Sequence, residues 1–264
     1  EEDDDEKEEG QQQQQKKKRK KQKKQKKDNE EGEQQYADAD DKDVRRMHSS
    51  WSAESFVNNA IVLIDTYNRF RDDGIEPVEA ILKTSAALFA EHGYDRASMN
   101  QIAKGCGVSK ALVYHYYDNK DALLFDIIRD HLDELIAAVE EAAPETASGE
   151  ARLLAYVGAL LDAYRDANAE HKIQINEMKR LPAEQQEDLK ERERALVKLF
   201  AGALTEAVPE LGNGSHLLKP VTMSLFGMVN WHYLWFREGG PVSREDYAGI
   251  ATRLILDGAR SLAA

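Results

Sequence analysis

Apolar residues recur at helical spacing along most of this chain, and no alternating strand pattern appears after residue 150. The first clear stripe follows Glu76-Pro77, where proline stands at a favoured helix N-terminus, and Gly93 is placed to end it. Its inner positions are Val78, Ile81, Leu82, Ser85, Ala86 and Phe89. The pattern therefore predicts a helix that begins near Glu76 and ends near Gly93.

Two short helices joined by a tight turn are predicted over residues 98–120. Ser98 and Gln101 have capping-box spacing, which favours a helix start at Ser98. Gly107 supplies the positive φ that a sharp turn needs, and Ser109 can cap a second helix. Four small or apolar residues are expected to fill the crossing between the helices: Ile102, Ala103, Val108 and Val113.

The second of these helices, expected to end near Tyr117, carries a polar outer face. Lys110, Ala111, Tyr114 and His115 share that face by 3.6-residue spacing, which is the geometry of a DNA-reading helix-turn-helix. We expect Lys110 to contact base edges, with Tyr114, His115, Tyr116 and Lys120 mainly on phosphates. The complete set of expected DNA-binding residues is Ser98, Lys104, Ser109, Lys110, Ala111, Tyr114, His115, Tyr116 and Lys120.

Further helices are predicted beyond this region. Asp118 or Asn119 should cap a helix that continues to about Glu141, and a break follows at Pro144–Gly149. The later helices are expected over residues 150–168, 169–180, 183–207, 215–237 and 243–262. The stretch Leu217–Trp235 is apolar almost all round, so every face of its helix must be covered. A partner helix from a second copy is the simplest cover for one side, and Ile255 on the last helix is expected in that interface.

Several aromatic and methionine side chains of the second half are candidates to line an effector pocket, although such residues at helical spacing also build plain core. They are Tyr156, Tyr164, Met178, Met223, Phe226, Trp231 and Trp235. Asn230 lies among apolar neighbours, and a buried amide needs hydrogen-bond partners, for which a ligand carbonyl is one candidate. Lys179 and Arg180 precede Pro182 and could meet a phosphate or be solvated; we include Arg180 among the expected ligand-binding residues.

The order of a small residue, glycine, an apolar residue, serine, Tyr-His-Tyr-Tyr and Lys120 resembles the TetR family of transcriptional regulators. AALFAEHGYDRASM resembles the entry to that family's helix-turn-helix. The resemblance implies an all-α fold, a phosphate role for Lys120, and a homodimer held by the last two helices. VSKALVYHYYDNKDALLFDI and the tail from Phe226 to Leu262 resemble the branch that senses acyl-coenzyme A, with the phenylacetyl-CoA-responsive regulators most similar.

Charge and composition narrow the classes of function. The formal net charge is −13, yet residues 96–120 hold four cations and one anion, a local net charge of +3. A DNA binder needs positive charge only on its docking face. Cys106 is the one cysteine in the sequence, so no intrachain disulfide can form, as suits the cytoplasm, where we expect the protein. No apolar run approaches the roughly 20 residues of a membrane helix, so no membrane association is expected.

The beginning of the chain differs from the rest in composition. An acidic block, a glutamine run and the basic run Lys16–Lys27 cannot bury enough apolar surface to order, so residues 1–46 are expected to be a disordered tail. The tail is either solvated or adds non-specific nucleic-acid affinity, and Met47 is a candidate start. Residues 47–74 are a possible extra helix and linker, 75–134 the DNA-binding domain, and 135–264 the ligand-binding and dimerisation domain.

Enzyme motifs are lacking. The sequence has no Gly-x-Ser-x-Gly elbow, no glycine-rich phosphate loop after a strand and no His-Glu-x-x-His pair. The seven histidines lack metal-ligand spacing, so neither a metal nor a cofactor is expected. The sequence thus predicts a homodimeric, ligand-responsive repressor of double-stranded operator DNA. The alternatives are a multidrug-type regulator of an efflux pump and a nucleic-acid-binding adaptor that acts through its basic N-terminal run.

Overall fold

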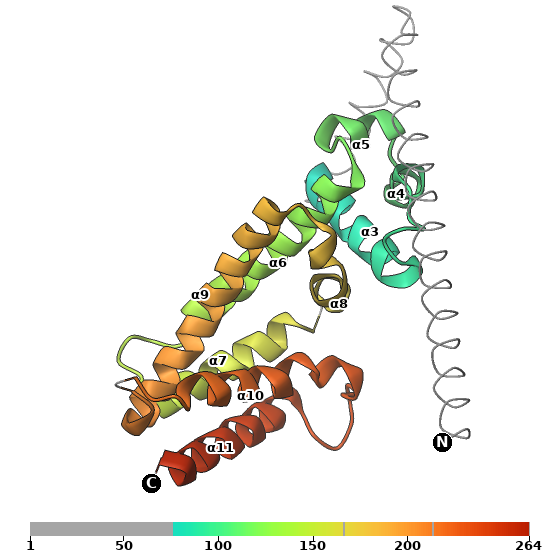
Figure 1. Ribbon diagram of the computed structural model, residues 1–264. Helices are drawn as coiled ribbons and strands as arrows, with labels where there is room; N and C mark the ends of the chain where they lie inside the picture. Colours follow the sequence, from blue (N-terminus) through green and yellow to red (C-terminus); the bar gives the residue numbers. More distant parts are fainter. Residues whose placement is uncertain (1–75, 166, 213, 264) are drawn as a thin grey trace, which may run out of the picture. The chain divides into compact units, whose positions relative to one another are not determined.

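The computed structural model describes residues 76–165, 167–212 and 214–263, and every regular element within them is a helix (Figure 1). The predicted all-α fold is confirmed. The predicted tail 1–46 and the helix and linker of 47–74 lie outside the described residues. The elements are α3 Pro77–His92, α4 Met99–Cys106, α5 Lys110–Tyr116, α6 Lys120–Glu141, α7 Gly149–Ala163, α8 Asn168–Glu177, η1 Met178–Arg180, α9 Ala183–Ala207, η2 Pro209–Leu211, α10 Leu218–Asn230, η3 His232–Leu234 and α11 Arg244–Ala263.

Helices α3, α4 and α5 pack around a small core together with the first half of α6. Ile81, Met99, Ile102 and Val113 are all fully buried there. Gly93 ends α3 with φ 84°, a conformation that favours glycine. Helices α3 and α4 approach closely at Gly105, where a Cβ atom would lie 2.8 Å from the Cγ2 atom of Thr84. The sequence pattern therefore places these helices well, down to their capping residues.

Helix α6 joins the two buried cores of the protein. Asn119 caps it by accepting a hydrogen bond from the amide of Ala122 at 2.9 Å. Buried residues up to Leu132 contact the core around α3–α5, whereas Leu135 and Val139 belong to the second core. The first core also takes in Ile173 of α8 and Leu189 of α9, so it is not built from the N-terminal helices alone.

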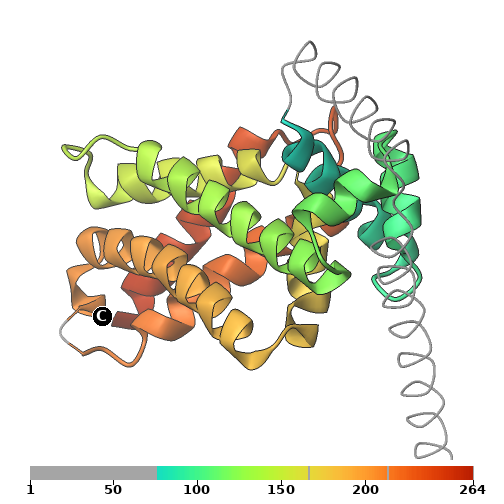
Figure 2. The same ribbon diagram turned by 90° about the horizontal axis from the view of Figure 1, so that it is seen from above.

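The second core is formed by α7, α9, α10 and α11 with the C-terminal half of α6 (Figure 2). In both views α6 and α9 lie side by side, as do α10 and α11 (Figures 1 and 2). Leu153, Leu160, Phe200 and Leu225 are fully buried between these helices. Gly149 begins α7 against the end of α9, where a Cβ atom would lie 2.4 Å from the main-chain nitrogen of Ala207.

The prediction of one helix over residues 215–237 is wrong, because α10 ends at Asn230 and the short η3 follows. The hydroxyl of Tyr247 donates to the main-chain oxygen of Met228 at 3.1 Å. In a continuing α-helix that oxygen would accept from the amide of residue 232. His232 instead turns inward, with its ring 4.2 Å from that of Phe236 and 5.0 Å from that of Tyr247. Tertiary packing thus outweighs the apolar periodicity of the segment.

The placement of Ile255 in an interface is also wrong, since this side chain is only 8% exposed and belongs to the second core. The apolar side chains that α11 does expose are Ile250, Leu254 and Leu262. They recur every four or eight residues and therefore form a single stripe along the helix.

Candidate DNA-binding and effector sites

Helices α4 and α5 form a helix-turn-helix with a glycine at its turn. Ser98 accepts a hydrogen bond from the amide of Gln101, whose side chain accepts from the Ser98 amide, which completes a capping box. Gly107 has φ 66° and ψ 31°, the left-handed conformation that a residue with a Cβ atom adopts only at a cost. Ser109 caps α5 by accepting from the amide of Leu112 at 3.2 Å. The turn therefore fixes the direction in which α5 leaves α4.

The expected DNA-binding residues differ in exposure. Lys104, His115 and Tyr116 are exposed, whereas Lys110, Ala111 and Tyr114 are half-buried. The ammonium of Lys110 lies 5.3 Å from the ring centroid of Tyr114. Ser98 and Ser109 are half-buried and use their hydroxyls as helix caps. The side chains of Lys104 on α4 and of His115 and Tyr116 on α5 are thus accessible to a duplex.

Lys120 begins α6 beside the turn between α3 and α4. Its ammonium donates to the main-chain oxygens of Tyr94 at 3.1 Å and Asp95 at 3.5 Å, and lies 4.6 Å from the Tyr94 ring centroid. The hydroxyl of Tyr94 donates to Asp121. Burial, and then this hydrogen bond, raises the pKa of the Tyr94 phenol. Tyr94 is buried beside Phe89, where it fills the space under the turn.

Two of the expected effector residues meet in the interior of the second half. The hydroxyl of buried Tyr164 donates to the side-chain oxygen of Asn230 at 2.9 Å. The Nε2 atom of His171 lies 3.2 Å from the main-chain oxygen of Asn230, and its ring lies 4.1 Å from that of Tyr164. We call the side chains gathered here the polar chamber; they are His131, Tyr164, His171, Gln174 and Asn230.

His131 and His171 are not among the residues that the sequence pattern predicts for an effector site. Each is 2% exposed, and their ring centroids are 5.9 Å apart. A signal for His131 was present, because it stands three residues after Ile128 and four before Leu135, both of which face the core. Burial lowers the pKa of both imidazoles, that of His131 to about 3, so both rings are neutral at pH 7.

The remaining expected effector residues lie elsewhere. Tyr156 and Phe226 are buried against Phe200, with ring centroids 5.6 and 5.0 Å from it, so they form close-packed core. Met178 packs against the core around α3–α5 and not against the second core. The core interpretation therefore holds for Tyr156 and Phe226, while effector binding by Tyr164 and Asn230 stays a prediction.

Four further expectations need correction. Met223, Trp231 and Trp235 are 48–52% exposed, so they line the outside of the chain and not an internal pocket. Arg180 pairs with Asp95 through two hydrogen bonds of 3.0 and 2.9 Å, and it also pairs with Glu177. Its guanidinium is therefore engaged by carboxylates of its own chain, because the bend at η1 brings it against the turn between α3 and α4.

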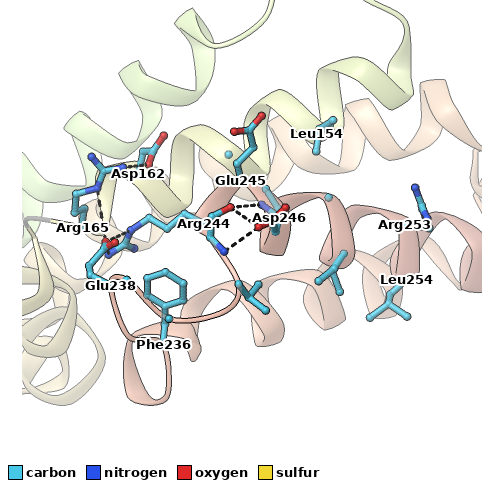
Figure 3. A pocket seen from close by; sticks show the side chains of 18 of the residues that line it. Leu154, Asp162, Arg165, Phe236, Glu238, Arg244, Glu245, Asp246, Arg253 and Leu254 are labelled. Carbon is cyan, nitrogen blue, oxygen red and sulfur yellow. Dashed lines mark hydrogen bonds and ion pairs between the residues drawn. The ribbon is translucent and has the colours of Figure 1, made fainter.

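A groove of about 1160 Å³ lies between α7, α11 and the loop that joins η3 to α11 (Figure 3). Arg244 pairs with Glu238 at 2.6 Å, and Arg165 pairs with Asp162 at 2.5 Å. The exposed side chains of Leu154, Ile250 and Leu254 also line it, and the expected effector residues do not.

None of the helices in the described part of the chain is both long and apolar enough to cross a membrane. Within the same ranges, no group of three or more His, Cys, Asp or Glu side chains is placed to hold a metal ion.

Comparison with known proteins decides the family. Residues 81–127 match the family described as "Bacterial regulatory proteins, tetR family", and residues 146–259 match the "Tetracyclin repressor-like, C-terminal domain". A TetR-family transcriptional regulator of solved structure from Bordetella parapertussis 12822 is 31% identical, with a TM-score of 0.64 over 68% of this chain and 94% of that one. The chain belongs to the TetR family.

Two other relatives of this TetR-family protein bear on its role. The transcriptional repressor KstR2 of Rhodococcus jostii strain RHA1 is 26% identical over 183 residues, which is 69% of this chain and 90% of that protein. The structure of AibR in complex with isovaleryl coenzyme A and operator DNA is 27% identical, with a TM-score of 0.54 over 71% of this chain and 97% of that one. Both similarities cover more than two thirds of this chain.

Proposed function

We propose that this protein is a homodimeric repressor that binds a near-palindromic operator and is released by a small-molecule effector. The observation that carries the proposal is the capped turn at Gly107, which sets α5 with the half-buried Lys110 and Tyr114 and the exposed His115 on one face. A helix presented in this way fits the major groove, and two copies would reach half-sites a helical turn or a multiple apart.

Exposed apolar side chains support dimerisation through α10 and α11. Met223 on α10 and the stripe of Ile250, Leu254 and Leu262 on α11 are each at least 45% exposed. Leu154 of α7 and the groove beside it extend the same apolar region. Burying such a region against a second copy would bring α10 and α11 together with their symmetry mates.

The effector proposed first is an acyl-CoA thioester, with phenylacetyl-CoA as the first choice. The similarity to AibR, whose structure holds isovaleryl coenzyme A, supports a thioester for this chain as well. The rings of Tyr164, Tyr233 and the two buried imidazoles lie 4.1–6.2 Å from their neighbours, and aromatic rings of this kind favour contact with an aromatic acyl group. A multidrug-type regulator with a broad apolar pocket is the alternative with the same fold and DNA-binding mode.

Helix α8 is the element best placed to couple effector and operator. His171 faces the polar chamber, while the ammonium of Lys172 next to it donates to the main-chain oxygen of Ala90 at 2.8 Å. At the end of α8, Arg180 of η1 reaches Asp95 beside the helix-turn-helix. An effector that shifts α8 would thereby move α3 and the turn, and it can change DNA affinity only by its differential affinity for the two states.

Calorimetric titration tests the proposal. The protein is titrated with phenylacetyl-CoA, free phenylacetate and a long-chain acyl-CoA, each with and without operator DNA. A 100-fold loss of DNA affinity corresponds to about 2.7 kcal/mol of coupling, and reciprocity requires operator to weaken effector binding by the same factor. We expect phenylacetyl-CoA to bind best and to be weakened by operator. Equal binding of all three compounds, or an affinity indifferent to DNA, would favour the multidrug-type regulator.

A further inference from the structure

The polar chamber holds hydrogen-bonding atoms that the described protein does not satisfy. They are Nδ1 and Nε2 of His131, Nδ1 of His171 and Oε1 of Gln174. Buried polar atoms nearly always have a partner, since an unsatisfied one costs free energy. The rings of His131 on α6 and His171 on α8 lie 5.9 Å apart, and Gln174 stands three residues after His171 on the same face of α8, so these four atoms point to a partner that enters from outside the chain.

The existing hydrogen bonds fix what these atoms can do. The main-chain oxygen of Asn230 can only accept, so the Nε2 atom of His171 must carry the hydrogen that it donates at 3.2 Å. The Nδ1 atom of His171 is then an acceptor. The neutral ring of His131 offers one N–H donor and one acceptor, and Oε1 of Gln174 is an acceptor. The chamber thus presents one donor and three acceptors to a partner.

Charge near the chamber excludes one class of partner. The side-chain amide of Gln174 donates to Glu193 at 2.9 Å. Burial, and then this carboxylate, raises the pKa of Tyr164. The imidazoles are neutral, because burial lowers the pKa of both. A free carboxylate placed here would meet a like charge from Glu193 and no cation among the chamber residues, so the chamber disfavours anions.

We propose, resting on the function proposed above, that the polar chamber anchors the effector through a neutral group that both accepts and donates hydrogen bonds. The N–H of His131 donates to a carbonyl oxygen of the effector. The acceptors on His171 and Gln174 receive an amide N–H or a hydroxyl of the same molecule. An acyl-CoA meets this pattern with its thioester carbonyl and the nearest amide N–H of its pantetheine arm, while the charged nucleotide end remains outside the chamber.

The test compares ligands that share one aromatic ring and differ only in the polar group. Phenylacetamide offers a carbonyl and an N–H, methyl phenylacetate offers a carbonyl alone, and phenylacetate is an anion. Dissociation constants are measured without DNA by ligand-observed NMR. We expect the affinity to fall in that order. Phenylacetate binding as tightly as phenylacetamide would overturn the proposal, as would Glu193-dependent binding of a cation such as tetraphenylphosphonium.

Variants of the full chain identify the anchoring residue. His131→Leu keeps apolar bulk but removes the donor, so phenylacetamide and phenylacetyl-CoA should each bind at least about tenfold more weakly. His131→Gln retains a donor and an acceptor and should recover most of the loss, which also separates the anchor from damaged folding. His216→Leu, at an exposed histidine, is the matched control and should bind like the wild type.

The two proposals fail in different ways. If His131→Leu binds both ligands as the wild type does, the imidazole only packs in the core and the anchoring proposal is overturned, whatever the operator result. If the wild-type protein binds phenylacetamide as expected but no acyl-CoA releases it from operator DNA, the anchoring proposal stands and the proposed effector function fails.

Discussion

At the scale of single residues, Lys120 has one role that the structure describes and another that stays a prediction. The resemblance to the family implies a phosphate contact, whereas the structure adds hydrogen bonds to the main chain of Tyr94 and Asp95. These bonds tie the start of α6 to the turn that precedes α4. The phosphate contact remains a prediction, and Lys120 also stabilises the frame that holds α4 and α5.

The two lysines of the candidate DNA site should respond differently to alanine. Lys120→Ala should weaken binding to operator and to random DNA by the same factor, and lower the slope of log affinity against log salt by about one. Lys110→Ala should weaken operator binding preferentially, because a base contact carries sequence information. Fluorescence anisotropy with both DNAs over a salt series measures this. If both variants lose the same factor on every sequence, the division of roles is wrong.

His131 should make stability depend on pH. Its pKa is lowered to about 3 in the folded state from 6.5, first by burial and then by the nearby His171. As the pH falls, the unfolded chain therefore takes up this proton at a higher pH than the folded chain does. The contribution of neutral His131 to the free energy of unfolding is complete above about pH 6.5 and is lost progressively as the pH falls toward 3. Each pH unit in that window should cost up to about 1.4 kcal/mol.

Urea unfolding at pH 7, 6, 5 and 4.5 measures that dependence. His131→Leu should show a shallower decline of the free energy of unfolding than the wild type, because it no longer has the proton to bind. His216→Leu, at an exposed site, should follow the wild type. Identical slopes for all three proteins would mean that the imidazole of His131 is not buried in the neutral form.

Whether the sequence predicts the role of a single residue depends on how far along the chain its partner lies. Ser98, Gly107 and Ser109 were assigned correctly because capping and turn geometry involve neighbours within four residues. The pairing of Arg180 with Asp95 joins residues 85 positions apart, and no local pattern announces it. The hydrogen bond between Tyr164 and Asn230 spans 66 positions, although the need of Asn230 for a partner was evident from its apolar neighbours.

At the scale of elements, helix starts were easier to predict than helix ends. Helix-breaking and capping residues in the sequence predict the start of α9 after Pro182 and the bounds of α6. The end of α10 depends on Tyr247 of α11, which hydrogen-bonds to the main chain of α10, and on the inward turn of His232. An apolar run without a breaker therefore gave a helix that was too long.

Arg180 should matter more for coupling than for stability. Its side chain is 35% exposed and that of Asp95 is 58% exposed, so Arg180→Gln should lower the free energy of unfolding by no more than about 1 kcal/mol. Because the pair joins η1 to the turn before α4, the same change should reduce the effect of phenylacetyl-CoA on operator affinity. Operator titrations with and without phenylacetyl-CoA give the coupling.

Arg194→Gln is the control for that measurement. Arg194 pairs with Glu187 at 2.7 Å on α9, and both side chains are more than half exposed. Arg194→Gln removes a comparable surface ion pair and should leave the coupling between effector and operator at the wild-type value. Should Arg180→Gln and Arg194→Gln respond equally to the effector, α8 and η1 are not the coupling path.

At the scale of the whole molecule, the exposed stripe of α11 predicts how copies associate. Leu254 is 61% exposed beside the groove, and Leu254→Asp would bury an unpaired charge in a dimer formed there. Analytical ultracentrifugation at micromolar concentration should give twice the 29.8 kDa chain mass for the wild type and the single mass for Leu254→Asp. Ala195→Asp, on the exposed face of α9, should remain dimeric. A monomeric wild type would contradict the interface.

The central claim is that the dimer recognises a symmetric DNA sequence through α5, and selection from a random DNA library tests it most directly. The purified full-length protein is incubated with the library, and bound duplexes are recovered and sequenced over several rounds. We expect one near-palindromic motif whose half-sites lie a helical turn or a multiple apart, enriched by the wild type and not by Lys110→Ala. Recovery of no motif, or of a motif without two-fold symmetry, would contradict the account.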